Sequence, residues 1–171
     1  MNDGERQLAV VTGGARGIGA AAARRFARDG HAVAILDTNA ELGEALARDL
    51  CAQGAQAGFH ACDVSDAQAL EGLAERLRSE FGPPAVLVTS AALIPNSESV
   101  LDMDLAAHDR MWRVNYFGTL HACRSFGRQM VARGRGAIVT LGSINSLLPL
   151  PLPAYNPGKV ALHRLTQLLA N

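Results

Sequence analysis

The 171-residue sequence is poor in lysine, cysteine and aromatic residues, and its positive and negative charges cancel. The three cysteines are widely spaced and odd in number, which is typical of reduced cytosolic thiols rather than a disulfide framework. No uninterrupted run of about 18 apolar residues occurs, so we expect no membrane span. A formal net charge of zero gives no reason to expect binding to nucleic acid or to an anionic membrane. The first residues lack the basic and apolar regions of a signal peptide, so we expect a cytoplasmic protein.

The five histidines and three cysteines are scattered along the chain. Cys51, His60 and Cys62 form the nearest group, but no fourth ligand follows at a spacing typical of a metal site. We therefore expect no metal ion.

Short apolar segments alternate with helical segments along the chain. Short apolar runs predict strands at 8–11, 31–36, 85–88 and 137–140, and a further strand with a weaker apolar pattern is predicted at 57–61. Helical periodicity predicts helices at 17–28, 40–53, 66–81, 104–132 and from about 154 onward. Ser65 is the expected N-cap of the third helix. Strands that are apolar throughout and separated by helices indicate a parallel sheet covered on both faces. We predict a single α/β domain over 1–171, with a doubly wound sheet of strand order 3-2-1-4-5.

A glycine-rich turn, Thr-Gly-Gly-Ala-Arg-Gly-Ile-Gly, connects the first predicted strand to the first predicted helix at 12–19. Glycines at three positions remove the Cβ atoms that would prevent a pyrophosphate from approaching the helix N-terminus. These positions are Gly13, Gly17 and Gly19. A turn of this kind between a strand and a helix predicts a dinucleotide-binding site.

Asp37 supplies a second indication of the same site. It closes the second strand eighteen residues after Gly19, near the ~20 expected for the acid that binds the ribose hydroxyls of NAD. Its carboxylate would repel a 2′-phosphate, so we predict NAD rather than NADP. The alternative is NADP binding through Arg16, an arginine in the glycine-rich turn that can contact a phosphate.

The only lysine of the chain, Lys159, lies four residues after Tyr155. On a helix, residues with this spacing share one face and lie one turn apart. An ammonium beside a phenol stabilises the phenolate, and a tyrosine in that position can exchange a proton with a substrate. Pro157 lies between the two residues and is tolerated only in a first turn, so the helix should begin no earlier than about residue 153.

Together these motifs resemble those of the short-chain dehydrogenase/reductase family, in its single-domain form, over essentially the whole chain. Three further positions match the family pattern: the pair Asp63-Val64 after the third strand, Asn115 in the long helix, and Ser143 after the fifth strand. The resemblance implies a Rossmann fold and an NAD-dependent oxidoreductase that interconverts a secondary alcohol and a ketone.

The resemblance also implies a role for each site residue. Tyr155 would be the general base in alcohol oxidation and the general acid in ketone reduction. Lys159 would hold the nicotinamide ribose, and Ser143 would donate a hydrogen bond to the substrate oxygen. Asn115 would hold a water that links Lys159 to solvent. The implied cofactor-binding residues are Gly13, Arg16, Gly17, Ile18, Gly19, Asp37, Asp63, Val64, Ser90, Ala91, Tyr155 and Lys159.

The sequence departs from the family pattern in two places. Thr-Ser-Ala-Ala at 89–92 stands where the family has Asn-Asn-Ala-Gly, which removes hydrogen-bond donors and adds a methyl group near the cofactor. The segment 147–153 alternates leucine with proline, which favours an extended chain. Since this segment borders the substrate in the family, we expect an apolar or cyclic substrate, with polyols and acyl ketones as the alternatives.

The pattern of the last helix still continues at Asn171, whereas family members go on with two more strands and a substrate-covering loop. We therefore expect the C-terminal strands to be missing and the fifth strand to be a sheet edge. A partial sequence is favoured over a naturally truncated relative. The resemblance implies a homodimer or homotetramer through helices 104–132 and 154–171. The alternative function is a catalytically silent dinucleotide-binding module or an inactive fragment.

Overall fold

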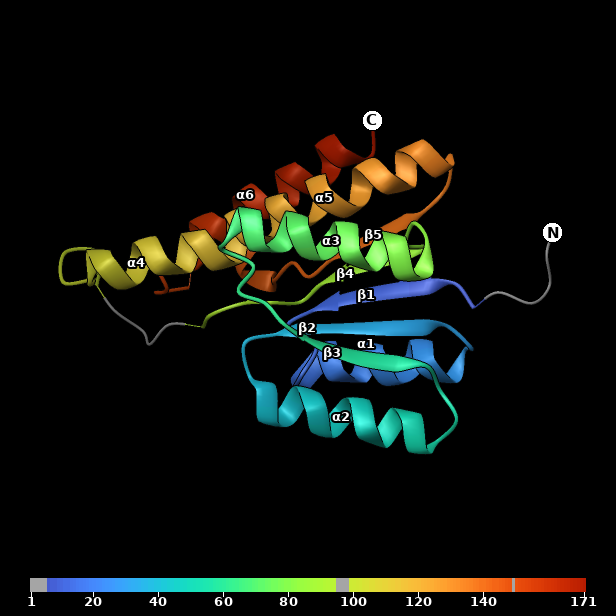
Figure 1. The fold of residues 1–171 in the computed structure, drawn as a ribbon. Helices are drawn as coiled ribbons and strands as arrows, with labels where there is room; N and C mark the ends of the chain where they lie inside the picture. The colour runs from blue at the N-terminus through green and yellow to red at the C-terminus, as the bar shows by residue number, and fades with distance from the viewer. Residues whose placement is uncertain (1–5, 95–98, 149) are drawn as a thin grey trace.

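The structure, a computed structural model, describes residues 6–94, 99–148 and 150–171 (Figure 1). Pro149 of the leucine–proline segment lies outside the described residues. Five parallel strands form one sheet in the order β3-β2-β1-β4-β5, which confirms the predicted fold class and strand order. The strands are β1 (Leu8–Thr12), β2 (Ala32–Asp37), β3 (Ala57–Ala61), β4 (Val86–Thr89) and β5 (Ala137–Thr140). Their bounds differ from the predicted ones by no more than one residue at either end.

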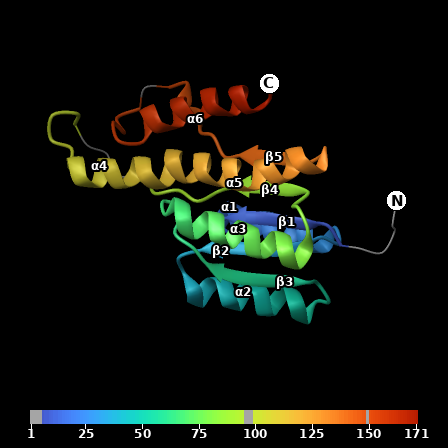
Figure 2. The same ribbon diagram turned by 45° about the horizontal axis from the view of Figure 1, so that its top comes forward.

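Helices cover both faces of the sheet, as Figures 1 and 2 show. They are α1 (Gly17–Arg28), α2 (Ala40–Ala52), α3 (Ala67–Phe81), α4 (Leu105–Trp112), α5 (Gly118–Arg133) and α6 (Asn156–Leu169). The pair α1 and α2 lies on one face, and α3, α5 and α6 lie on the other. Among the residues that the structure describes, no helix is long and apolar enough to cross a membrane.

The hydrophobic core has two parts because alternate residues of a strand point to opposite faces of the sheet. Leu8 and Val10 of β1 pack with α3 and α5 in one cluster, which includes the fully buried Phe126. Val11 of the same strand packs on the other face with α1 and α2. This double burial is the reason that the strands read as continuous apolar runs.

The N-cap of α3 is Asp66, so the prediction of Ser65 is wrong. The Asp66 carboxylate accepts a hydrogen bond from Ala69 N at 2.9 Å. The Ser65 hydroxyl instead donates to the Asp63 carboxylate at 2.7 Å. Both residues are capable caps, and the neighbouring carboxylate draws the serine away from the helix.

The long helix predicted at 104–132 is continuous, but it contains a π turn at Arg113–Phe117 between α4 and α5. Asp104 caps its start by accepting from Ala106 N at 2.8 Å. Gly134 ends it in the left-handed conformation, with φ of 75°. Single π turns inside α-helices occur frequently at functional sites, and this one contains Asn115.

The strand β5 pairs with β4 alone among the described residues and is the edge of the sheet, as predicted. Its residues alternate between exposed and half-buried positions, and Val139 is half exposed. Helix α6 is connected to this strand by a hydrogen bond of 2.7 Å between the hydroxyls of Thr140 and Thr166.

Candidate active site

The predicted site residues come together at one edge of the sheet. In a parallel sheet the carboxyl ends of all strands lie at the same edge, where ligands of open α/β sheets bind. At this edge, the end of each strand or the loop that follows it supplies at least one predicted residue. They are Gly13 after β1, Asp37 at the end of β2, Asp63 after β3, Ser90 after β4 and Ser143 after β5.

The glycine-rich turn lies directly against the loop after β4. Gly13 has a φ of 62°, and a Cβ atom at this position would lie 2.5 Å from Ala91 N. Ser90 N donates to the Thr12 carbonyl at 3.1 Å, and Ala91 N donates to the Thr12 hydroxyl at 3.4 Å. The loop with the unusual sequence Thr-Ser-Ala-Ala is therefore held by β1 itself.

The N-terminus of α1 follows the turn and is open to solvent on the site edge. A Cβ atom on Gly19 would lie 2.1 Å from the Gly13 carbonyl oxygen, so only glycine permits the helix to begin this close to the turn. Arg16 precedes the helix without capping it through its side chain, and the first turn has no acidic residue. Arg16 and Ile18 are exposed, with Ile18 at 68%. The free N–H groups of such a terminus, with the helix dipole, bind anions such as phosphate.

Asp37 connects this turn to the second strand. Its Oδ2 accepts from Ala15 N at 3.0 Å, and its Oδ1 accepts from Asn39 N at 3.0 Å. A carboxylate has about four lone-pair positions, so each oxygen keeps one position for a further donor such as a ribose hydroxyl.

Asp63 and Val64 form part of the loop after β3. Asp63 Oδ1 accepts from the backbone N–H and hydroxyl of Ser65, at 2.9 and 2.7 Å. Its Oδ2 accepts from Arg110 Nη2 at 2.8 Å. Desolvation by burial raises the pKa of Asp63, but the hydrogen bonds from Arg110 and Ser65 outweigh it and lower the pKa overall. Arg110 lies on α4, 47 positions later, and no motif of the sequence indicated it as a site residue.

Val64 is a buried packing residue in this structure. A Cβ atom on Gly118 would lie 2.5 Å from Val64 Cγ2, so the glycine at the start of α5 makes room for the valine. This contact fixes the loop after β3 against the long helix.

Asn115 is 4% exposed and lies in the π turn. Its Oδ1 accepts from Leu93 N at 2.7 Å, and its Nδ2 donates to the Leu93 carbonyl at 2.9 Å. The side-chain amide therefore holds the loop after β4 by a pair of hydrogen bonds. The water relay assigned to Asn115 stays a prediction, and the contacts to Leu93 show an additional structural role that the sequence pattern did not indicate.

Tyr155 and Lys159 lie one helical turn apart, as their spacing predicts. Lys159 N donates to the Tyr155 carbonyl at 3.1 Å, and Pro157 lies in the first turn of α6. Lys159 Nζ lies 5.5 Å from the centre of the Tyr155 ring and donates to the Leu141 carbonyl at 2.7 Å. Lys159 is only 4% exposed, and burial lowers its pKa. Within the described residues it has no carboxylate partner.

Ser143 is half-buried after β5 and caps a short 3-10 turn, Ile144–Ser146. Its Oγ accepts from Asn145 N at 3.2 Å, an arrangement in which the hydroxyl hydrogen can point to another acceptor. Helix α6 packs against both this turn and the π turn. The elements that carry the four predicted catalytic residues, Asn115, Ser143, Tyr155 and Lys159, are therefore neighbours.

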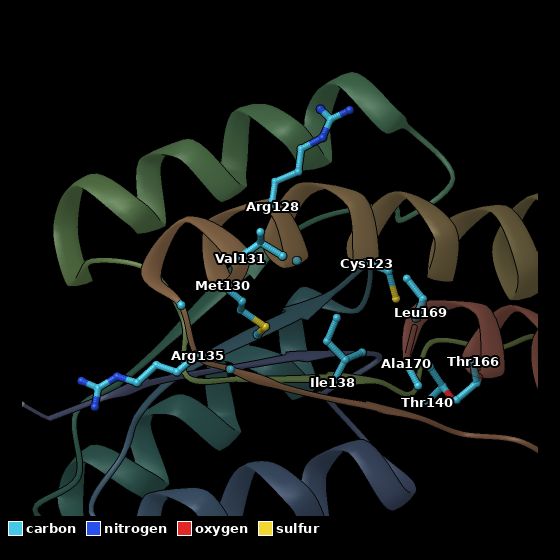
Figure 3. Close-up of a pocket in the computed structure, with 13 residues that line it drawn as sticks. Cys123, Arg128, Met130, Val131, Arg135, Ile138, Thr140, Thr166, Leu169 and Ala170 are labelled. Carbon is cyan, nitrogen blue, oxygen red and sulfur yellow. The ribbon is translucent and has the colours of Figure 1, made fainter.

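A separate groove of about 870 Å³ lies between α5, β5 and α6, as Figure 3 shows. Met130 and Ile138 point into it, while Arg128 and Arg135 point away from it. Leu169 and Ala170, near the end of the chain, also line it, but none of the predicted site residues does. In the part of the chain that the structure describes, no group of three or more histidine, cysteine or acidic residues could hold a metal.

Comparison with known proteins places these features in a family. The family model described as short chain dehydrogenase matches residues 7–171. Galactitol 2-dehydrogenase of Rhizobium johnstonii is 38% identical over 172 residues, with 98% of this chain and 65% of that protein covered. D-threitol dehydrogenase of Mycolicibacterium smegmatis is 37% identical over 166 residues, with 96% and 63% covered. The chain thus spans less than two thirds of the length of these two curated relatives.

A solved structure gives the same result for the fold. The structure titled NAD+-bound xylitol dehydrogenase superposes with a TM-score of 0.92 at 29% identity, and the match covers 99% of this chain and 67% of that one.

Proposed function

This chain belongs to the short-chain dehydrogenase family of oxidoreductases, and on that premise we propose that it binds NAD and, within the complete protein, interconverts a secondary alcohol and a ketone. The observation that carries the proposal is the pair formed by Tyr155 and Lys159. The lysine lies one turn after the tyrosine, is buried, and is oriented by the Leu141 carbonyl at 2.7 Å. In the alternative, a silent dinucleotide-binding module, these residues would only hold the nicotinamide ribose, and Tyr155 would exchange no proton.

The residues at the edge of the sheet fit a dinucleotide. The glycine-rich turn presents the N–H groups of α1 to a pyrophosphate, and a side chain at Gly13 or Gly19 would collide with neighbouring backbone. Asp37 has lone pairs available for the ribose hydroxyls, and its negative charge disfavours a 2′-phosphate. These features favour NAD over NADP, and the solved relative that contains NAD+ is consistent with this preference.

The chain's own residues would move and stabilise the proton. Bound NAD would supply the hydride acceptor in oxidation. The Tyr155 phenol would take the proton from the substrate hydroxyl and return it in the reverse direction. The Ser143 hydroxyl would donate to the substrate oxygen, and its partner at Asn145 N holds it in place.

Lys159 would act on the phenol through its charge and on the cofactor through its hydrogen bonds. An ammonium has three N–H donors, of which one is used by the Leu141 carbonyl. The other two would serve the nicotinamide ribose and the proton path to solvent. Because the group is buried, its effect on the phenolate is stronger than it would be in water.

Polyols are the substrate class that we propose to test first. The two curated relatives are named for galactitol and D-threitol, and the solved relative is named for xylitol. A second candidate class, apolar or cyclic secondary alcohols, is favoured by the leucines of the segment near Tyr155. Leu147, Leu148 and Leu150 are all exposed, with Leu147 at 70%.

The test is NAD reduction by these polyols and by an alicyclic alcohol, with Tyr155→Phe as the decisive variant. Tyr116→Phe is the matched control, because Tyr116 is the other tyrosine of the chain and contacts Trp112 and Phe117 through its ring. We expect Tyr155→Phe to abolish turnover and Tyr116→Phe to retain it. Equal turnover by wild type and Tyr155→Phe would exclude the proposed mechanism. NADH binding without turnover of any alcohol would instead support the silent module.

Calorimetric titration with NADH and with NADPH tests the cofactor assignment separately. We expect selective binding of NADH, and we expect Asp37→Ala to reduce that selectivity. Preferential binding of NADPH that Asp37→Ala left unchanged would instead support the alternative, in which Arg16 binds the 2′-phosphate of NADP.

A further inference from the structure

The segment that precedes α6 is held by hydrogen bonds among its own residues. The Leu150 carbonyl accepts from Leu152 N at 2.7 Å and from Asn156 Nδ2 at 2.6 Å. The Leu152 carbonyl accepts from Tyr155 N at 3.0 Å and from Asn156 N at 2.9 Å. Asn156 is thus bonded to this segment twice, through its backbone and through its side chain, and Tyr155 is the residue directly before it.

Proline limits the backbone donors of this segment. Pro151 and Pro153 have no N–H group, so they cannot donate to the Leu150 carbonyl. The bond from Leu152 N closes a turn of only three residues, whereas the bond from Asn156 Nδ2 spans six positions. The side-chain amide therefore supplies the longer connection between the segment and the start of α6.

The Asn156 side chain also carries a buried atom that nothing satisfies. Among the residues that the structure describes, its Oδ1 has no hydrogen-bond partner. A buried acceptor without a partner lowers the free energy of unfolding, and its presence in a native structure calls for a reason. Stability does not supply that reason, because a leucine would fill a similar space without the buried oxygen.

The same segment connects the two groups that are proposed to contact the substrate oxygen. Ser143 lies at its start and Tyr155 at its end. The Ile144 carbonyl accepts from Leu147 N at 2.9 Å and from Leu148 N at 3.1 Å, so the chain after Ser143 is turned as well. A shift of this segment would therefore move Tyr155 relative to Ser143.

We propose that Asn156 is a positioning residue, whose amide fixes the segment at Leu150 and thereby sets the place of Tyr155 relative to Ser143. This inference rests on the proposed function, because it needs Tyr155 to exchange a proton with the substrate. Asn156 itself transfers no proton. Its effect on the rate comes from geometry, since a misplacement of about 1 Å at a reacting group can lower a rate about a hundredfold.

The substitution Asn156→Leu separates positioning from stability. The Leu150 carbonyl keeps Leu152 N as a donor, and the unpartnered Oδ1 is removed together with the amide. We therefore expect a Tm no lower than that of wild type. In the complete protein, kcat for the alcohol that wild type oxidises should fall at least about tenfold, while KM for that alcohol should change less than about threefold.

Asn156→Gln is the conservative variant. It should recover part of the lost kcat, because its amide can still donate to the Leu150 carbonyl. The matched control is Asn171→Leu. The Nδ2 of Asn171 donates to the Gln167 carbonyl at 3.4 Å in an exposed position at the other end of α6, so this variant should keep the wild-type kcat.

Steady-state kinetics and thermal unfolding of the same preparations decide the matter. A wild-type kcat in Asn156→Leu would refute the positioning role. A kcat that falls together with Tm would also refute it, because Asn156 would then have a structural role only. An equal loss of kcat in Asn171→Leu would show that the effect does not depend on the bond to Leu150.

These outcomes are distinct from failure of the proposed function. If wild type turns over no alcohol, or if Tyr155→Phe turns over as fast as wild type, the proposed function and this inference both fail. If Tyr155→Phe abolishes turnover while Asn156→Leu retains it, the positioning role alone is refuted.

Discussion

Replacing Asn115 with aspartate tests how the loop after β4 is held to the long helix. In the native chain, Asn115 accepts from Leu93 N at 2.7 Å and donates to the Leu93 carbonyl at 2.9 Å. Aspartate has the same shape, but it sets a carboxylate oxygen against that carbonyl and buries a charge. One lost buried hydrogen bond together with desolvation of a charge costs on the order of 3 kcal/mol. For a domain of this size, this corresponds to a fall of roughly 6–12 °C in Tm.

The stability deficit of Asn115→Asp should depend on pH in a defined direction. Burial raises the pKa of an aspartate at this position above its value in the unfolded chain. The protonated form can donate to the Leu93 carbonyl as the amide does. The free energy of unfolding of Asn115→Asp is therefore closest to that of wild type below the unfolded-state pKa of the aspartate. It falls as the pH rises from there through the folded-state pKa. We expect the deficit to be smallest near about pH 4 and to grow toward about pH 7.

Urea denaturation followed by far-ultraviolet circular dichroism, repeated across this pH range, measures the deficit. Asn39→Asp is the matched control, because Asn39 is the exposed N-cap of α2 and its Oδ1 accepts from Leu42 N at 3.0 Å. Aspartate is an equally good cap, so no comparable loss should occur there. A deficit for Asn115→Asp that is absent, or that does not change with pH, would refute the claim that the Nδ2 hydrogen bond holds the loop.

Two further substitutions test the turn and the buried lysine. In thermal unfolding, Gly13→Ala should lower Tm by several degrees more than Gly54→Ala. Both glycines have positive φ, but only at Gly13 would a Cβ atom lie against backbone, 2.5 Å from Ala91 N. Equal losses of Tm would show that the backbone around Gly13 relaxes to make room for the Cβ atom. Lys159→Met should raise the free energy of unfolding relative to wild type near neutral pH, because burial lowers the pKa of Lys159 and makes its charged form costly. The stability advantage of Lys159→Met over wild type should shrink as the pH rises toward the unfolded-state pKa of lysine, ~10.4, because over this range the wild-type lysine loses its proton in the folded chain before the unfolded one. An advantage that does not change with pH in urea titrations would contradict this interpretation.

Local sterics and periodicity made much of the fold predictable. The strand order follows from apolar runs separated by helices, because parallel strands that pack helices on both faces have few allowed topologies. The spacing of Tyr155 and Lys159 predicts one shared helix face, and the hydrogen bond from Lys159 N to the Tyr155 carbonyl confirms it. The helix spacing rests on contacts within a few residues along the chain, whereas the strand order rests on the small number of allowed topologies, since Ala9 of β1 pairs with the distant Val86 of β4.

Competition between similar groups was not predictable in the same way. Ser65 and Asp66 both qualify as the cap of α3, and the sequence pattern alone favoured the wrong one. Arg110 decides between them in part, because it approaches from α4 and binds Ser65 together with Asp63. The π turn at Arg113–Phe117 likewise has no counterpart in the apolar periodicity of the long helix.

The sequence by itself therefore determined the doubly wound sheet, the glycine-rich turn and the relative placement of Tyr155 and Lys159. Only the tertiary structure decided which partners orient the site. Arg110 meets Asp63 across 47 positions, Asn115 meets Leu93 across 22, and Lys159 meets Leu141 across 18. Which polar groups pair in these contacts depends on how the strands and helices pack. A sequence pattern does not show which distant donors and acceptors that packing brings within hydrogen-bonding distance.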